Sequence, residues 1–235
     1  MTLNKMIQRS PVRVFEKVIG GGLGAGNLGV VLSRPGVGKT GFLIGLAVDQ
    51  LLQGKKVLYI STKESVDHIN TFFEEVFHSM STALELDNLL QRQLEMERNR
   101  QILVYNRKSF SLEKLAESAG FLKEVTGFEP DMVILDGTPR FESTEVWEIE
   151  GVKKLGVDWG AEIWTSSNTH REGQEMDDRG VPSTVVKFED HLNVIVALCP
   201  ESEHIKINTI KEHGSEDIAQ VSLELDPRTM LIRWR

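Results

Sequence analysis

Runs of consecutive apolar residues alternate with amphipathic stretches along most of the chain. Five apolar, β-rich runs occupy residues 28–33, 56–61, 101–106, 131–136 and 161–167. The amphipathic stretches between them cover residues 40–53, 65–99, 112–126 and 144–158. Strands that are apolar throughout, with helices between them, are typical of a parallel sheet covered on both faces. The pattern predicts an α/β fold with a mostly parallel sheet flanked by helices.

The rhythm changes after residue 190. Four short runs, "LNVIVAL", "IKINTIK", "VSLELD" and "LIRWR", follow one another with short polar connections. Such spacing predicts C-terminal antiparallel strands that extend the sheet. Because we find no repeat, low-complexity tract or linker, we expect an N-terminal arm at 1–17 and a single domain at 18–235.

The stretch 81–100 leaves its role open. A stripe of four leucines at helical spacing predicts a surface helix that packs on the domain, and the alternative is a helix that faces a partner. The four residues are Leu86, Leu89, Leu90 and Leu94.

Charge and cysteine content narrow the setting. The net charge of −8 gives no overall attraction to nucleic acid or to anionic membranes. No apolar stretch reaches the roughly 20 residues that cross a bilayer, and the start of the chain lacks the apolar region of a signal peptide. The single Cys199 excludes a disulfide framework. We therefore expect a cytoplasmic protein without membrane association.

The segment "SRPGVGKT", residues 33–40, follows an apolar run and precedes an amphipathic one. It matches the phosphate-loop pattern GxxxxGK[ST] except at Ser33, where the pattern has Gly. Gly36 and Gly38 allow a tight turn, Lys39 supplies an ammonium for phosphates, and Thr40 supplies a hydroxyl for Mg²⁺. The expected nucleotide-binding set is Ser33, Arg34, Pro35, Gly36, Val37, Gly38, Lys39, Thr40 and Gly41.

A magnesium ion in such a loop needs an acidic partner at the end of a neighbouring strand. The run "DMVILD" provides it, because four apolar residues lead to Asp136 in the pattern called Walker B. We therefore expect Thr40 and Asp136 to hold the metal, with ATP and Mg²⁺ as the ligands.

Residues 18–69, with "GGGLGAG" before the loop and "STKES" after the next strand, resemble the RecA-like P-loop ATPase superfamily, particularly its KaiC and RadA types. The "RPGVGKT" wording is also similar to the ATPase domain of replicative hexameric helicases. Weaker similarity continues to about residue 215. The resemblance implies a RecA-like core with an additional strand between the phosphate-loop strand and the Walker B strand. It further implies a nucleotide at a subunit interface, within rings (a hexamer among them) or filaments.

The chain departs from that family where hydrolysis is concerned. The family ends its second strand with a Glu that activates water, whereas this chain has Lys63 at that position and Glu64 beside it. The polar sensor corresponds to Asn168. The trans-acting Lys-x-Arg corresponds to Lys211 and His213, and a His stabilises transition-state charge less well than an Arg. Four of these residues have a plainer alternative: Glu64 as a helix-terminal carboxylate, Asn168 as a polar loop residue, and Lys211 and His213 as parts of a solvated turn.

Three functions follow from these residues. The first is a slow Mg-dependent ATPase whose nucleotide state controls self-assembly or a protein partner. The second is an ATP-sensing module with little or no hydrolysis. The third, a DNA recombination or helicase motor, is disfavoured because residues 171–190 hold six acidic and three basic side chains where a DNA-facing loop is expected.

Overall fold

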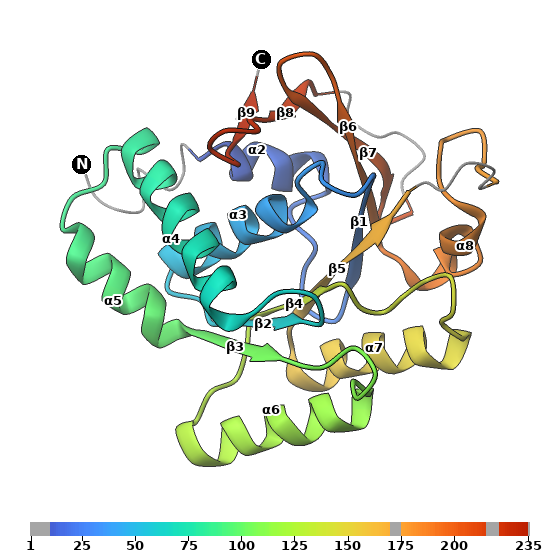
Figure 1. Ribbon diagram of the computed structural model, residues 1–235, viewed down its shortest axis with the longest axis horizontal. Helices are drawn as coiled ribbons and strands as arrows, with labels where there is room; N and C mark the ends of the chain where they lie inside the picture. The colour runs from blue at the N-terminus through green and yellow to red at the C-terminus, as the bar shows by residue number, and fades with distance from the viewer. Residues whose placement is uncertain (1–9, 170–174, 215–220, 235) are drawn as a thin grey trace.

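Every predicted apolar run forms a strand in the computed structural model, which describes residues 10–169, 175–214 and 221–234. The nine strands within these described ranges join one sheet in the order β3-β2-β4-β5-β1-β6-β7-β8-β9 (Figure 1). The strands are β1 (Leu28–Ser33), β2 (Val57–Ser61), β3 (Arg100–Val104), β4 (Met132–Asp136), β5 (Glu162–Asn168), β6 (Val194–Pro200), β7 (Ile205–Glu212), β8 (Leu223–Leu225) and β9 (Ile232–Trp234).

The sheet is parallel from β3 through β6 and antiparallel from β7 to β9. β6 pairs antiparallel with β7, as predicted, but it also pairs in parallel with β1, which the prediction did not include. β5 lies between β1 and β4, which confirms the additional strand that the resemblance implied.

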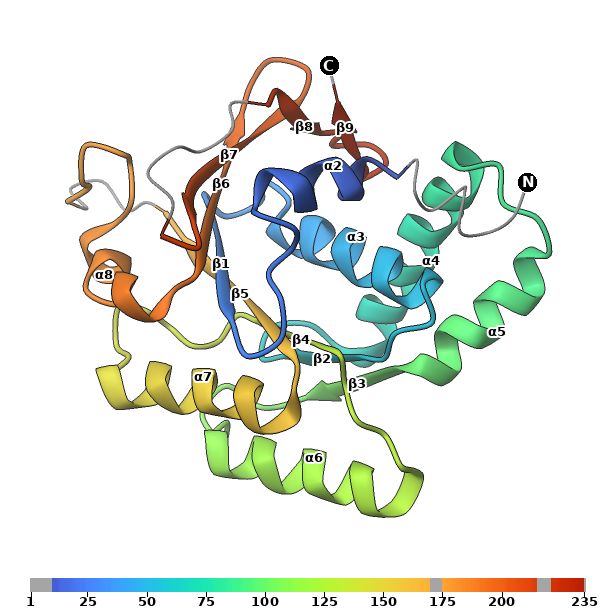
Figure 2. The same ribbon diagram turned by 180° about the vertical axis from the view of Figure 1, so that it is seen from behind.

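Helices cover both faces of the sheet. Figures 1 and 2 show α2, α3 and α4 on one face and α6 and α7 on the other. The helices are α2 (Pro11–Val18), α3 (Lys39–Leu52), α4 (Val66–Ala83), α5 (Leu89–Asn99), α6 (Leu112–Thr126), α7 (Val146–Trp159), α8 (Ser183–Val186) and the 3₁₀ helix η1 (Glu189–His191).

Alternate residues of the central strands divide between two hydrophobic clusters, one on each face. Val31 of β1 joins the cluster beneath α2, α3 and α4, whereas Val30 and Leu32 join the cluster beneath α6 and α7. Side chains of successive strand residues point to opposite faces, so a strand buried on both sides must be apolar throughout. This explains why the central runs show no alternation in the sequence.

The predicted amphipathic stretch 65–99 consists of two helices, α4 and α5. Of the leucine stripe, Leu86 is buried in the connection, whereas Leu90 is 73% exposed and Leu94 is 48% exposed. The side of α5 that packs on the domain carries Met96 instead. The three leucines of the stripe that lie on α5 therefore face solvent.

Helix α2 overlaps the predicted arm. Its Val12 and Phe15 are buried in the core cluster with α3, and the Phe15 ring packs edge-to-face against Phe42 at 5.4 Å. The described part of the arm is thus packed against the domain.

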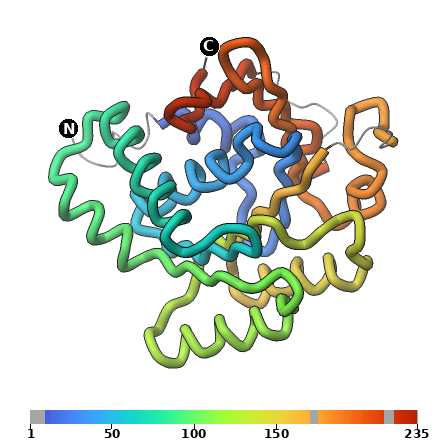
Figure 3. The backbone as a smooth tube through the Cα atoms, viewed as in Figure 1, coloured from blue at the N-terminus to red at the C-terminus, as the bar shows by residue number. Residues whose placement is uncertain are grey.

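The order of the strands places the candidate site. Because parallel strands run in one direction, the residues after β1, β2, β4 and β5 meet along the same edge of the sheet. Figure 3 traces how the backbone passes there from β1 into α3 and from β2 into α4. Ser33, Asp136 and Asn168 each end a strand at this edge.

Candidate nucleotide-binding site

The segment predicted to be a phosphate loop connects a buried strand to a buried helix. β1 ends at Ser33 and α3 begins at Lys39, with Gly38 as its N-cap. Gly36 and Gly38 have φ values of +80° and +123°, which residues with a Cβ rarely adopt. The two glycines predicted to shape the loop therefore adopt torsions that suit glycine, and the N-terminus of α3 opens at the loop, as an anion site requires.

Lys39 shows what Ser33 contributes at the unusual position of the motif. The ammonium donates to the carbonyl and the hydroxyl oxygen of Ser33, at 2.9 and 3.0 Å, and to the carbonyl of Arg34 at 3.2 Å. Burial, with a smaller contribution from the nearby Lys63, lowers the Lys39 pKa to about 8. The serine hydroxyl thus helps to hold the motif lysine, so its presence does not disrupt the local arrangement.

Asp136 lies fully buried at the end of β4, within reach of three hydroxyl groups. Thr40 donates to its Oδ2 at 2.8 Å, Tyr59 to the same oxygen at 3.2 Å, and Ser166 to Oδ1 at 2.8 Å. Burial and the neighbouring Asp136 carboxylate raise the Tyr59 pKa well above its usual value, so that side chain remains a donor. The phosphate-loop threonine and the Walker B aspartate therefore meet, although 96 positions separate them in the chain.

Thr40 and Asp136 suit a magnesium ion. Mg²⁺ prefers hard oxygen ligands and in nucleotide sites takes few protein ligands, with phosphates and water completing its shell. Within the described residues, no group of three or more His, Cys, Asp or Glu side chains could hold a metal by itself. The pair thus fits a metal that is shared with a bound phosphate.

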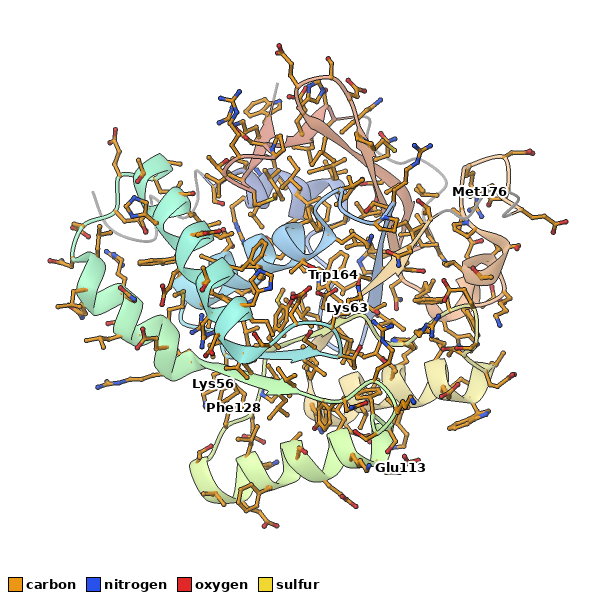
Figure 4. The ribbon with its side chains drawn as sticks, viewed as in Figure 1. Lys56, Lys63, Glu113, Phe128, Trp164 and Met176 are labelled. Atoms are coloured by element: carbon orange, nitrogen blue, oxygen red, sulfur yellow. The ribbon has the colours of Figure 1, made fainter. Side chains whose placement is uncertain are left out.

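Lys63 and Glu64 diverge after β2, as neighbouring side chains on an extended strand do. Lys63, which is labelled in Figure 4, turns toward the site, and its ammonium lies 3.6 Å from Oδ1 of Asp136. Glu64 turns toward α4 and pairs with the ring of His68 at 2.6 Å. The structure therefore brings the Lys63 ammonium to Asp136, whereas the Glu64 carboxylate contacts His68 and adds to the raised pKa of the nearby Tyr59.

The turn that orients these two side chains is fixed by Ser61. The buried hydroxyl oxygen of Ser61 accepts hydrogen bonds from the backbone N–H groups of Lys63, at 3.1 Å, and Glu64, at 3.0 Å. Sequence reasoning did not assign Ser61, Tyr59 or Ser166 to the site. The available signal was a polar side chain within a strand that is otherwise buried and apolar, since such a group needs a hydrogen-bond partner.

Asn168 ends β5 directly beside the phosphate loop. Its Cα is paired in register with that of Ser33, and the N–H of Thr169 donates to the Ser33 carbonyl at 2.9 Å. The Asn168 side chain is exposed at this edge. Its position is suitable for a polar sensor, and the sensor role itself remains a prediction.

Lys211 and His213 lie at the end of β7 and contact their own chain. The Lys211 ammonium donates to the Glu189 carbonyl at 2.6 Å, and Nε2 of His213 lies 3.0 Å from the Gly22 carbonyl. The carboxylate of Glu212 also packs over Gly20, where an added Cβ would lie only 2.6 Å from its Oε1. These contacts attach the end of β7 to η1 and to the glycine-rich segment before β1.

Gly41, placed in the nucleotide-binding set, has a packing role as well. A Cβ at this position would lie 2.6 Å from Sδ of Met230, which belongs to the turn between β8 and β9. Gly45, one helical turn later, also approaches Met230. Because glycine in a helix interior costs about 1 kcal/mol relative to alanine, the two glycines signal a close approach of backbone to α3.

Comparison with curated proteins places the chain near one group of proteins. It is 32% identical over 118 residues to the DNA repair protein RadA of Campylobacter jejuni, which covers 47% of this chain and 26% of that protein. The RadA of Aquifex aeolicus is 30% identical over 116 residues, with the same two shares. The chain is distantly similar to RadA over about half of its length. The RadA of Listeria monocytogenes, 27% identical over 137 residues, covers 58% of this chain and 24% of its own length.

The relationship to RadA identifies the α/β fold as RecA-like, as the resemblance implied. No family model matches the chain. It spans about a quarter of the length of the RadA proteins that it matches. In the described part of the chain, no helix is long and apolar enough to cross a membrane.

Proposed function

We propose that the chain binds ATP with Mg²⁺ at the phosphate loop and hydrolyses it slowly. The observation that carries this proposal is the 2.8 Å hydrogen bond from Thr40 to Asp136, which joins the two halves of a nucleotide–metal site. The arrangement of Lys39 and the two glycine torsions around it supports the same conclusion.

Each group has a distinct task in this proposal. Backbone N–H groups of the loop and the N-terminus of α3 bind phosphate oxygens, and Lys39 pairs with the outer phosphates. A bound metal would supply positive charge to the phosphates, and Thr40 and Asp136 would hold it. Because the Lys39 ammonium is bound to loop carbonyls in the structure described here, an entering phosphate would replace these neutral acceptors with an anionic one, which binds the ammonium more strongly.

Slow hydrolysis follows from what surrounds the attacking water. A general base must lie within hydrogen-bond reach of that water, and the positively charged Lys63 cannot accept its proton. Glu64 is engaged with His68. Loss of an effective base typically costs about 10²–10⁴ in rate. The same observation favours the second candidate, a sensor that binds ATP and scarcely turns it over.

We further propose that the nucleotide state controls self-assembly, or a protein partner, within the cytoplasm. The resemblance to proteins that form rings or filaments supports this, and a hexamer is one arrangement that it allows. Lys211 and His213 would need to exchange their contacts with Glu189 and Gly22 to act on a neighbouring subunit. Light scattering should show a homo-oligomer that ATP favours, and a particle that stays monomeric with saturating ATP would contradict assembly.

DNA binding is the less favoured proposal, although the RadA relatives are named DNA repair proteins. Arg179 pairs with both Asp177 and Glu189, which neutralises a basic side chain of the segment expected to face DNA. Lys187 donates to the Thr144 carbonyl. Fluorescence anisotropy at low salt should show little binding to single-stranded DNA, whereas tight, salt-sensitive binding would favour the motor.

Calorimetric titration with Mg·ATP tests the central proposal. Lys39→Ala should reduce affinity at least about 100-fold, because a charge-assisted contact to phosphate is lost in a buried site. Lys55→Ala is the matched control, since Lys55 is exposed before β2, at the opposite end of that strand from the site. Circular dichroism of both variants shows whether they fold. A folded Lys39→Ala protein with wild-type affinity would remove Lys39 from the site.

A further inference from the structure

Lys63 brings a second lysine ammonium to the phosphate site. Its ammonium lies 3.6 Å from Asp136, the residue expected to hold the metal, and its side chain is 29% exposed whereas that of Asp136 is fully buried. The electrostatic effect of Lys63 also reaches Lys39, whose pKa it helps to lower. The phosphate site therefore contains two lysine charges from different elements before any metal or nucleotide enters.

The surroundings of Lys63 are built to receive its side chain. Gly137 directly follows Asp136 with φ of +87°, and a Cβ there would lie 2.6 Å from Cε and 2.8 Å from Cγ of Lys63. Thr62 holds the same turn in place through hydrogen bonds to the carbonyls of Asp136, at 3.3 Å, and Gly137, at 3.1 Å. The lysine chain thus lies along a surface that only glycine leaves open.

The distance between the Lys63 ammonium and the Asp136 carboxylate distinguishes this contact from an ordinary structural ion pair. At 3.6 Å the contact with Asp136 is longer than a hydrogen bond, and the carboxylate already receives hydrogen bonds from three hydroxyls. The lysine therefore supplies charge to a buried carboxylate without being locked to it. A partly exposed ammonium on a flexible stem can turn from such a contact toward a phosphate oxygen.

A magnesium ion at Thr40 and Asp136 would supply positive charge to the same carboxylate and to the same phosphates. Two cations close to one buried carboxylate repel each other, and the repulsion is strong where water is excluded. The presence of Lys63 therefore lowers the benefit of the metal and at the same time replaces part of it.

We propose that Lys63 is a nucleotide-binding residue that takes over part of the role of Mg²⁺, so that the protein binds a nucleoside triphosphate with little dependence on the metal. This inference rests on the proposed function, because it concerns the same phosphate site. In this proposal Lys63 contacts the outer phosphates, so its presence does more than replace the catalytic carboxylate of the family.

The test is calorimetric titration with ATP, once in excess Mg²⁺ and once in EDTA. Wild-type affinity should fall less than about tenfold when the metal is removed, because Lys63 remains. Lys63→Met keeps most of the stem but removes the charge, so its affinity should fall about 100-fold or more in EDTA and recover largely with Mg²⁺. Lys63→Arg should behave like the wild type, since it keeps the charge.

Lys55→Met is the matched control, because it removes one positive charge from the other end of β2 and should leave the metal dependence unchanged. Thermal melting with Mg²⁺ alone gives a second readout. The metal should raise the melting temperature of Lys63→Met more than that of the wild type, since Asp136 then lacks its lysine.

The outcomes separate this inference from the proposed function. A wild-type protein that binds Mg·ATP but loses more than about 100-fold in EDTA overturns the inference and leaves the proposed function intact. Equal metal dependence in wild type and Lys63→Met does the same. If the wild type fails to bind ATP even with Mg²⁺, both proposals are overturned. Because the wild-type comparison needs no variant, a Lys63→Met protein that fails to fold does not prevent the decision.

Discussion

The loop after β1 and the turn after β2 lie at the same edge of the sheet, yet they depart from the family pattern to different degrees. The first loop keeps each group that phosphate binding requires, with a serine that supports the motif lysine. The turn after β2 places Lys63 toward the site, whereas the carboxylate of the adjacent Glu64 pairs with His68 on α4. In the proposed function, nucleotide binding and water activation are therefore assigned to separate segments, so that one can change while the other is kept.

Asp136 connects the two segments. It accepts a hydrogen bond from Thr40 of the loop region and lies beside Lys63 of the second turn. A buried carboxylate is costly unless hydrogen bonds and positive charge compensate it. The second segment thus contributes to the charge balance of the first, even though it lacks a base aimed at the site.

The largest expected effect is on ATP turnover and comes from placing a carboxylate at position 63, in the turn after β2. Lys63→Glu should raise ATP turnover about 100-fold at saturating Mg²⁺, because a general base contributes about 10²–10⁴ to such reactions. A steady-state phosphate-release assay measures the change. Lys63→Gln, which removes the charge without adding a base, is the control and should stay within a few-fold of the wild type.

Brisk turnover by the wild type, left unchanged by Lys63→Glu, would show that the water is activated by another group. The slow hydrolysis that we attribute to Lys63 in the turn after β2 would then be wrong.

The sequence predicted the loop, the Walker B aspartate and most of the sheet because each leaves a strong local signal. Glycine, lysine and threonine at fixed spacing mark the loop, and uninterrupted apolar runs mark strands buried on both faces. The parallel pairing of β6 was missed because a single apolar run does not reveal which neighbour it pairs with. Pairing is set by tertiary packing.

The catalytic surroundings were harder to predict for a related reason. Lys63 and Glu64 are adjacent in the chain, and hydrogen bonds of Ser61 and Thr62 to neighbouring backbone groups fix the turn that presents them. The leucine stripe of 81–100 is a second example. Its period is helical, but Met96 occupies the buried side, since periodicity identifies a face without saying what covers it.

A smaller effect concerns Asp136, which both segments share. Tyr59→Phe removes one of its three hydroxyl partners and should lower the free energy of unfolding by about 1–2 kcal/mol, because a buried hydrogen bond to a charged group is lost. Urea denaturation measures it. Tyr105→Phe is the matched control, since Tyr105 donates to the neutral Ser118 hydroxyl in a half-buried position, and it should cost less.

If Tyr59→Phe leaves stability unchanged, Asp136 is compensated without the tyrosine, and the coupling between the two segments is weaker than the structure indicates.

A further prediction concerns a carboxyl group outside the site whose pKa is shifted by burial. Glu162 begins β5, at the opposite end of that strand from Asn168, and accepts a hydrogen bond from Gly24. Burial raises its pKa from 4.5 to about 7. The folded protein therefore holds this proton more tightly than the unfolded chain, so Glu162 contributes less stability as pH rises from about 4.5 through 7.

Glu162→Gln resembles the protonated side chain. It should match the wild type near pH 4 and be more stable by about 1–2 kcal/mol at pH 8, a part of the full linkage because the residue is not fully enclosed. Thermal melts across this range measure the difference, and ATP affinity should not change. A difference between the two proteins that is constant with pH would contradict the shifted pKa.

The smallest expected effect examines Glu64, the carboxylate nearest in sequence to the position of the missing base. Its Oε2 lies 2.6 Å from Nδ1 of His68, on the first turn of α4, while the adjacent Lys63 faces Asp136. Because the Glu64 carboxylate pairs with His68 and makes no contact with Asp136, Glu64→Gln should change ATP turnover less than about twofold. His68→Ala serves as the companion variant, because it frees the carboxylate without removing it.

Two outcomes would show that Glu64 reaches the water through a rearranged turn. The first is that Glu64→Gln lowers turnover tenfold or more. The second is that His68→Ala raises turnover and the double variant abolishes the gain. The second segment would then retain a base, and the separation between binding and water activation would be one of degree.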